Sequence, residues 1–171
     1  AAGAHLSEFG SVEAVAKTKG EIYEGLTKNS VAIINADDAF AAQWVQQAGE
    51  ASITRFSLST KGDAEVRGEY EGAGQLQILT PAGDVSVTLP LEGRHNAANA
   101  LAATAAALAT GATLEQVKRG LESMHVVPGR LQRKGGIHGS QIIDDTYNAN
   151  PASLAAALQV LAACHGDRYL A

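Results

Sequence analysis

The chain has 171 residues, a net charge of −5 and one cysteine, and 46% of its residues are hydrophobic. The acidic balance argues against non-specific nucleic-acid binding, because no basic surplus exists to neutralise phosphates. A single cysteine excludes an internal disulfide and fits a reducing compartment, and no apolar run approaches the ~20 residues of a membrane span. The first ten residues lack a signal-peptide pattern, so we expect a soluble cytoplasmic protein that neither inserts into a membrane nor binds nucleic acid.

The first third of the sequence alternates between helical and strand patterns. Residues 11–26 predict a helix with Ser11 as its N-cap, and residues 37–48 predict a second helix. Short apolar runs at 30–35 and 51–58 are typical of buried strands. This alternation indicates a parallel sheet with crossover helices, and therefore an α/β fold.

The middle of the sequence has a different pattern. Residues 64–89 contain short alternating segments separated by turn residues, which predict a small antiparallel β meander. Two helices follow, at 96–109 and 113–124. The second begins with a predicted capping box of Thr113 and Gln116.

The last quarter predicts a hairpin and one more helix. The segment RLQRKGGIHGSQIIDD, residues 130–145, has strand patterns on both sides of a glycine-rich turn. Pro151 then suits the first turn of a helix that reaches about Cys164. The polar stretch between Asp145 and Pro151 is a predicted domain boundary, because it separates a strand from a new helix.

Two residues near the start have more than one interpretation. Lys19 shares a predicted apolar stripe with Val15 and Ile22, where burial of an unpaired ammonium is costly. It is either a lysine that snorkels at the edge of the core, or a reactive or modified lysine with a lowered pKa. His5 offers an imidazole, but one ligand does not make a metal site.

Five later residues have side chains that suit nucleotide chemistry, and each has a plainer alternative. Asn96 and Asn99 lie one helical turn apart and have the donors and acceptors to bind a purine edge, although Asn96 could simply cap the helix. Arg130 follows Pro-Gly in a tight loop and suits a phosphate, or is an ordinary surface arginine. The pair Asp144 and Asp145 ends a strand, where a carboxylate can accept ribose hydroxyls or form a turn.

Several common site motifs are missing from the sequence. It contains no G-x-x-x-x-G-K-[ST] phosphate loop and no G-x-G-x-x-G after a strand. It also contains no Cys/His spacing typical of zinc and no G-x-S-x-G nucleophile elbow. The sequence therefore lacks the motifs that would by themselves identify a phosphate, dinucleotide, zinc or serine-nucleophile site.

Five segments, in this order, resemble the Mur ligase family of peptidoglycan synthesis: AHLSEFGSVEAVAKTKGEIY, NADD, GRHNAANALAA, PGRLQR and IIDDTYNANP. The segments DDTYNANP and GSVEAVAKTKGEI are similar to the branch that adds D-alanyl-D-alanine to UDP-N-acetylmuramoyl-tripeptide. The resemblance implies that residues 1–144 are the C-terminal part of an ATP-binding central domain, with a mostly parallel sheet flanked by helices and an antiparallel meander. Residues 145–171 would be the hinge and first helix of a Rossmann-like C-terminal domain.

The resemblance also implies a set of ligands. His5 would bind Mg²⁺, and Lys19, carried as a carbamate, would be a catalytic residue that helps to bind the metal. ATP would be bound by Asn96 and Asn99 at the adenine, Arg130 at a phosphate and Asp145 at the ribose, with Asp144 as the alternative. Tyr147, Asn148 and Asn150 would line the hinge. Ala4 replaces an aspartate found in sister enzymes, so that carboxylate has no counterpart here.

The implied reaction is ATP-dependent amide bond formation through an acyl phosphate, by a monomeric enzyme. The family's N-terminal substrate domain, phosphate loop and a metal-binding glutamate have no match, so we expect a fragment that is inactive alone. One alternative is another amide ligase of the superfamily, similar to folylpolyglutamate synthase or cyanophycin synthetase, although the hinge sequence argues against it. The other is a non-catalytic nucleotide-binding module.

Overall fold

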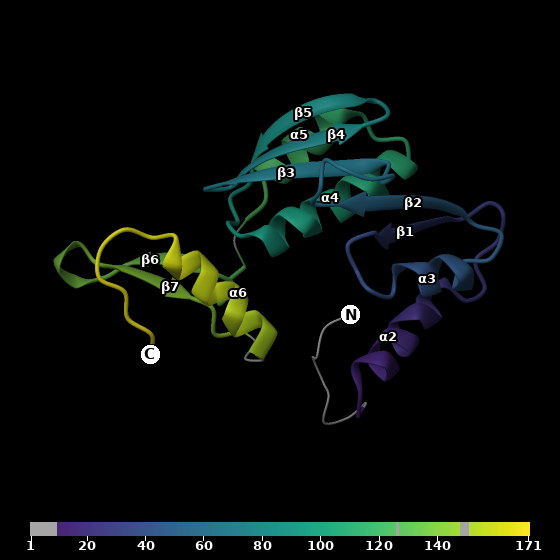
Figure 1. The fold of residues 1–171 in the computed structure, drawn as a ribbon. Helices are drawn as coiled ribbons and strands as arrows, with labels where there is room; N and C mark the ends of the chain where they lie inside the picture. The colour runs from purple at the N-terminus through teal and green to yellow at the C-terminus, as the bar shows by residue number, and fades with distance from the viewer. Residues whose placement is uncertain (1–9, 126, 148–150) are drawn as a thin grey trace.

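The computed structural model of the chain describes residues 10–125, 127–147 and 151–171. Its helices are α2 (Val12–Gly20), α3 (Ala41–Gln47), α4 (Arg94–Ala109), α5 (Leu114–Glu122) and α6 (Pro151–Ala162), with short 3₁₀ turns η1 (Glu21–Tyr23) and η2 (Ile137–Gly139). Its strands are β1 (Val31–Asn35), β2 (Ser52–Ser57), β3 (Val66–Gly72), β4 (Gln75–Thr80), β5 (Gly83–Thr88), β6 (Gln132–Gly135) and β7 (Gln141–Asp144). Figure 1 shows their arrangement.

The first five strands form one mixed sheet in the order β1-β2-β3-β4-β5. The β1–β2 and β2–β3 pairs are parallel, and the two pairs of the β3–β4–β5 meander are antiparallel. The predicted α/β fold and its meander are confirmed. The meander extends the same sheet, so the described sheet is evenly mixed rather than mostly parallel. In the parallel β2–β3 pair, only Phe56 and Ser57 at the end of β2 pair with the start of β3. The chain therefore does not have to return along the length of β2, and a loop without a crossover helix connects the two strands.

Helix α4 packs on the sheet at close range because small residues form its contact face. Leu101 is fully buried, and a Cβ on Gly68 of β3 would lie 2.8 Å from its Cδ2. Glycine on the strand therefore makes room for the leucine of the helix. The other buried hydrophobic residues of α4 are all alanines: Ala97, Ala100 and Ala105.

A second, smaller core joins α2 and α3 to β1 around Trp44. The indole Nε1 donates to the Ala16 carbonyl oxygen at 3.0 Å, and this contact ties the two helices together. The helix predicted at 11–26 is shorter, because α2 ends at Gly20, a poor helix former, and continues as a 3₁₀ turn. The helix predicted at 37–48 begins only at Ala41. Asp37 is instead part of a loop, where it accepts hydrogen bonds from Ser57 and from the backbone at residue 58.

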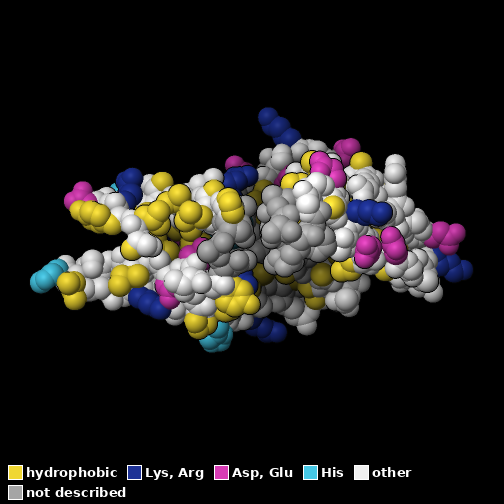
Figure 2. All heavy atoms as spheres, turned by 90° about the horizontal axis from the view of Figure 1, so that it is seen from below, with side chains coloured by type: hydrophobic (Ala, Val, Ile, Leu, Met, Phe, Trp, Pro, Cys, Tyr) yellow, Lys and Arg dark blue, Asp and Glu magenta, His cyan; other side chains and the backbone are white. Residues whose placement is uncertain are grey.

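Hairpin β6–β7 and α6 lie at the opposite end of the molecule from α2 (Figure 1). Both were predicted, as was the α5 capping box of Thr113 and Gln116, and all three are confirmed. Hydrophobic side chains gather on this end (Figure 2), and they include the exposed Ile142, Leu154 and Leu158. No helix within the described residues combines the length and apolar character needed to cross a membrane.

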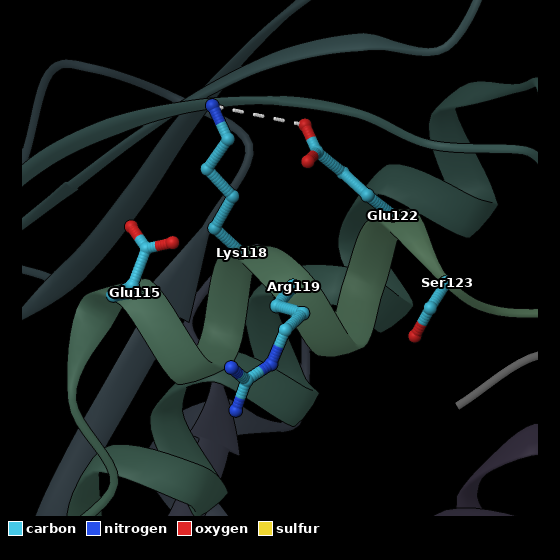
Figure 3. A pocket seen from close by; sticks show the side chains of 5 residues that line it. All are labelled: Glu115, Lys118, Arg119, Glu122 and Ser123. Carbon is cyan, nitrogen blue, oxygen red and sulfur yellow. Dashed lines mark ion pairs between the residues drawn. The ribbon is translucent and has the colours of Figure 1, made fainter.

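Strand β5 lies at the edge of the sheet, and side chains of α5 cover its outward backbone groups. Lys118 Nζ donates to the Ser86 carbonyl oxygen at 3.0 Å, and the Thr88 N–H donates to Glu122 Oε1 at 3.2 Å. The two side chains also form an ion pair at 3.8 Å along a shallow hollow on α5 (Figure 3). An uncovered edge strand is a template for pairing with another chain, so these contacts protect the sheet from edge-to-edge association.

We expect the double variant Lys118→Ala/Glu122→Ala to self-associate through β5, because Ser86 and Thr88 would then offer free strand-pairing groups. Sedimentation velocity over a range of protein concentrations would show concentration-dependent dimers or larger species. The matched control is Glu115→Ala/Arg119→Ala, which removes two charges from the same hollow without uncovering the strand. Equal sedimentation of the two variants would contradict the protective role.

Candidate functional site

The structure brings the PGRL loop and the DDTY segment together at the open end of hairpin β6–β7. The hairpin register pairs Gln132 with Asp144, so the residues just outside the two strands also face each other. The Leu131 N–H donates to Asp145 Oδ1 at 3.1 Å, and the Tyr147 N–H donates to the Gly129 carbonyl oxygen at 3.0 Å. The PGRL loop and the DDTY segment, which are separate in the sequence, therefore form one structural unit.

Two residues of this unit, one on each side of Arg130, have a positive backbone φ angle. Gly129 has φ +73°, and a Cβ there would lie 3.1 Å from the Tyr147 nitrogen and 3.2 Å from Thr146 Oγ1. Leu131 is buried and has φ 49°, a left-handed conformation that a branched side chain seldom adopts. A left-handed leucine persists only where the surrounding contacts hold the backbone in place, and such residues are often found at functional sites.

Arg130 lies between Gly129 and Leu131, and its guanidinium faces an aromatic ring. The Cζ atom is 4.1 Å from the centroid of the Tyr147 ring, within the range of a cation–π contact. Both side chains are exposed. Their contact links the predicted phosphate ligand to the predicted hinge residue that follows the DD pair.

The two adjacent aspartates have different partners. Asp144 accepts hydrogen bonds from Lys134 Nζ on one oxygen, and from the backbone and hydroxyl of Thr146 on the other. These contacts, the Lys134 hydrogen bond first, lower the pKa of Asp144 to about 2. Asp145 uses Oδ1 for Leu131, and its Oδ2 accepts no hydrogen bond from the described residues. Asp145 is therefore the aspartate with an oxygen available for a ligand.

Asn96 does not cap α4, so the alternative interpretation of this asparagine is wrong. The N-cap is Gly93, and Asn96 Nδ2 donates to the Glu92 carbonyl oxygen at 2.8 Å. The backbone N–H of Gly93 donates to the Tyr70 hydroxyl at 2.8 Å, which fixes the start of the helix against β3. Asn96 is half-buried, and Asn99, one turn further on, is exposed.

The start of α4 is also linked to the hairpin, through contacts that the sequence did not indicate. Arg133 on β6 donates to Glu92 Oε2 at 2.8 Å and to Gln141 Oε1 at 2.9 Å. Partial burial lowers the pKa of His95, and the negative charge of Asp145 opposes that shift. A cavity of about 220 Å³ lies at this junction, lined by Pro90, Glu92, Leu131, Gln132, Arg133, Ile143 and Val160. Asn96, Arg130 and Asp145 thus lie on connected segments.

Strand β7 pairs only with β6, and not with the five-stranded sheet. The expectation that Asp144 and Asp145 end a strand is confirmed, but the rule for ligand sites at the edge of an α/β sheet does not apply to this hairpin. The aspartates are positioned instead by the PGRL loop and by charged residues of β6.

The structure does not place Lys19 with these residues. Lys19 is exposed on α2, whose buried residues are Val15, Ala16 and Gly20, so its predicted place on an apolar stripe is wrong, and its role as a reactive or modified lysine stays a prediction. The stripe fails because α2 ends at Gly20 and Ile22 is 75% exposed. In Figure 1 α2 lies with α3 and β1, away from the hairpin.

The remaining predicted ligands and hinge residues, His5, Asn148 and Asn150, lie outside the described residues. Within residues 10–125, 127–147 and 151–171, no group of three histidine, cysteine or acidic side chains is arranged to hold a metal ion. The predicted metal ligands therefore remain a prediction.

Comparison of two alanine variants should separate conformational strain from crowding at Gly129. Gly111 has φ +90° and open space around it, so Gly111→Ala should cost about 1–2 kcal/mol of unfolding free energy for the backbone alone. Gly129→Ala should cost roughly 1 kcal/mol more, because its Cβ also crowds Tyr147 and Thr146. Urea unfolding measures both losses. Equal losses would contradict the tight contact.

A pH titration tests the contacts of Asp144. Its folded-state pKa of about 2 lies below the ordinary 3.8, so its contribution to stability is complete above pH 4 and is lost as the pH falls towards 2. In Lys134→Met the pKa measured by carboxyl NMR should rise towards 3.8, and Ser140→Ala, elsewhere on the hairpin, should leave it unchanged. A pKa that Lys134→Met does not move would refute the lysine contact.

Comparisons with known proteins show which family the chain belongs to. The family model for the Mur ligase middle domain matches residues 2–107. A UDP-N-acetylmuramoyl-tripeptide--D-alanyl-D-alanine ligase from Escherichia coli (strain K12) is 43% identical over 173 residues, which cover 99% of this chain and 38% of that protein. The chain therefore spans little more than a third of the length of this relative.

Solved structures show the same likeness. A crystal structure of MurF from Acinetobacter baumannii has a TM-score of 0.88 at 37% identity, covering 98% of this chain and 37% of that one. Mycobacterium tuberculosis folylpolyglutamate synthase, solved with ADP and AMPPCP, has a TM-score of 0.73 at 26% identity, covering 93% of this chain and 37% of that one. Since the family model matches more than half of its residues, the chain belongs to the Mur ligase family.

Proposed function

We propose that this chain carries nucleotide-binding residues of an ATP-dependent ligase that adds D-alanyl-D-alanine to UDP-N-acetylmuramoyl-tripeptide. The proposal rests on one observation above all: the start of α4, the PGRL loop and the DDTY segment converge on one junction in a Mur ligase family member. The choice of substrates is supported by the name of the Escherichia coli relative at 43% identity. The folylpolyglutamate synthase alternative has weaker support, at 26% identity.

Each residue proposed to bind the nucleotide has a functional group suited to the adenine, ribose or phosphate that it would contact. The exposed carboxamide of Asn99 and the half-buried one of Asn96 would bind the adenine edge. Asp145 Oδ2 would accept a ribose hydroxyl, and the exposed guanidinium of Arg130 would bind a phosphate. The neighbouring Asp144 is a poorer ribose ligand, because Lys134 and Thr146 already occupy both of its oxygens.

The proposed reaction has two steps. The tripeptide carboxylate attacks the γ-phosphorus of ATP, the bond to ADP breaks, and an acyl phosphate forms. The amino group of D-alanyl-D-alanine then attacks the acyl carbon and expels phosphate, leaving an amide. Arg130 would stabilise negative charge on the phosphates during this transfer.

The described residues do not by themselves fit magnesium. They contain no three-ligand group, and the unmodified amine of Lys19 lacks the oxygen ligands that this cation prefers. His5 and carbamylated Lys19 are therefore proposed as ligands on the family resemblance alone, with Lys19 as the catalytic residue, and no step above is assigned to the metal.

The proposed division of the chain follows the same resemblance. Residues 1–144 would be the C-terminal part of the ATP-binding domain, and 145–171 the hinge and first helix of the next domain. The complete enzyme would be a cytoplasmic monomer. The sequence contains no phosphate-loop motif, so the 171-residue chain alone should have little or no activity.

Phosphate release by the complete protein tests both the substrates and the aspartate. We expect release with UDP-N-acetylmuramoyl-tripeptide, ATP and D-alanyl-D-alanine, and none when glutamate replaces the dipeptide. Asp145→Asn should raise the KM for ATP about tenfold, the scale of one charged hydrogen bond, whereas Asp144→Asn should raise it less. Turnover with glutamate would favour a folylpolyglutamate-type enzyme. No turnover with any acceptor would favour a non-catalytic module.

A further inference from the structure

The partner of the Arg130 guanidinium is an aromatic ring, that of Tyr147, and not an acidic side chain of the described residues. The guanidinium lies over the face of the ring, with Cζ 4.1 Å from the centroid, and forms no ion pair with any acidic side chain among the described residues. The nearest arginine in the sequence, Arg133, is held by Glu92 instead. Of the two arginines in the PGRLQR segment, Arg130 therefore contacts an aromatic ring and Arg133 contacts an acidic side chain.

An aromatic ring and a carboxylate contact different parts of an arginine guanidinium. A carboxylate occupies the N–H donors in the guanidinium plane, as Glu92 does for Arg133. An aromatic ring contacts the face of the plane and leaves those donors directed outward. The ring thus favours one orientation of Arg130, and no acidic side chain among the described residues forms an ion pair with the guanidinium, so its donors stay available to an anion. Without the ring, an exposed arginine would sample many rotamers before binding.

The backbone fixes the ring relative to the arginine. The Tyr147 N–H donates to the carbonyl oxygen of Gly129, the residue just before Arg130, at 3.0 Å. Gly129 has no Cβ that could keep the two chain segments apart. The position of Arg130 therefore depends on the conformation of the segment that contains Tyr147, four residues before the start of α6.

From this geometry we propose that Tyr147 is a positioning residue for Arg130. It orients the guanidinium towards the nucleotide phosphates and makes phosphate binding depend on the contact between the PGRL loop and the DDTY segment. The inference rests on the proposed function for its ligand, ATP, but the positioning itself is a property of the free protein.

A double-mutant cycle in the complete protein tests the role in binding. An exposed cation–π contact corresponds to a two- to fivefold change in affinity. We expect Tyr147→Leu to weaken ATP binding, measured by calorimetry, by that factor, and Tyr147→Phe, which keeps the ring, to bind like wild type. In an Arg130→Ala background, Tyr147→Leu should cause no further loss. A full additional loss there, or equal losses for the Phe and Leu variants, would overturn the proposal.

A second measurement separates this proposal from the proposed function. The side-chain protons of Arg130 should show an upfield ring-current shift by NMR in wild type and Tyr147→Phe, and lose it in Tyr147→Leu. If that shift is present but wild type does not bind ATP, the proposed function fails. If ATP binds and Tyr147→Leu removes the shift without changing affinity, the positioning role fails and the proposed function stands.

Discussion

The hydrogen bond between the Tyr147 N–H and the Gly129 carbonyl oxygen is the contact on which the candidate site depends. It closes the open end of hairpin β6–β7 and sets Arg130 against the Tyr147 ring. It needs a glycine, since any side chain at 129 would crowd the opposite segment. One steric constraint thus determines where both the arginine and the neighbouring Asp145 are presented.

The charged residues around this contact divide into two groups. Lys134 with Asp144, and Arg133 with Glu92, neutralise each other and tie strands and loops together. In the second group, Arg130 has no charged partner among the described residues, and Asp145 keeps one oxygen free of them. A binding site needs both groups, because the paired charges hold the backbone in place for the available ones.

The sheet and α4 contribute to this site from a distance. Close packing of alanines and Leu101 against Gly68 fixes the axis of α4, and the Tyr70 hydroxyl accepts a hydrogen bond from its N-cap residue, Gly93. The Glu92–Arg133 ion pair then joins that helix start to the hairpin. The asparagines of α4 and the proposed ligands on the hairpin, Arg130 and Asp145, are therefore held by one continuous set of contacts, although 30 to 50 residues separate them in sequence.

Local patterns in the sequence determined the strands, the hairpin, the capping box of α5 and the start of α6, because periodicity, turn residues and capping act between near neighbours. They also named Asn96, Asn99, Arg130 and the Asp144–Asp145 pair as residues suited to a nucleotide. Only the tertiary structure decided that β3–β5 extend the main sheet, that Lys19 is exposed, and that Asp144 rather than Asp145 is held by Lys134. Each of these depends on which distant residues come into contact, and a local pattern carries no information about its partners across the fold.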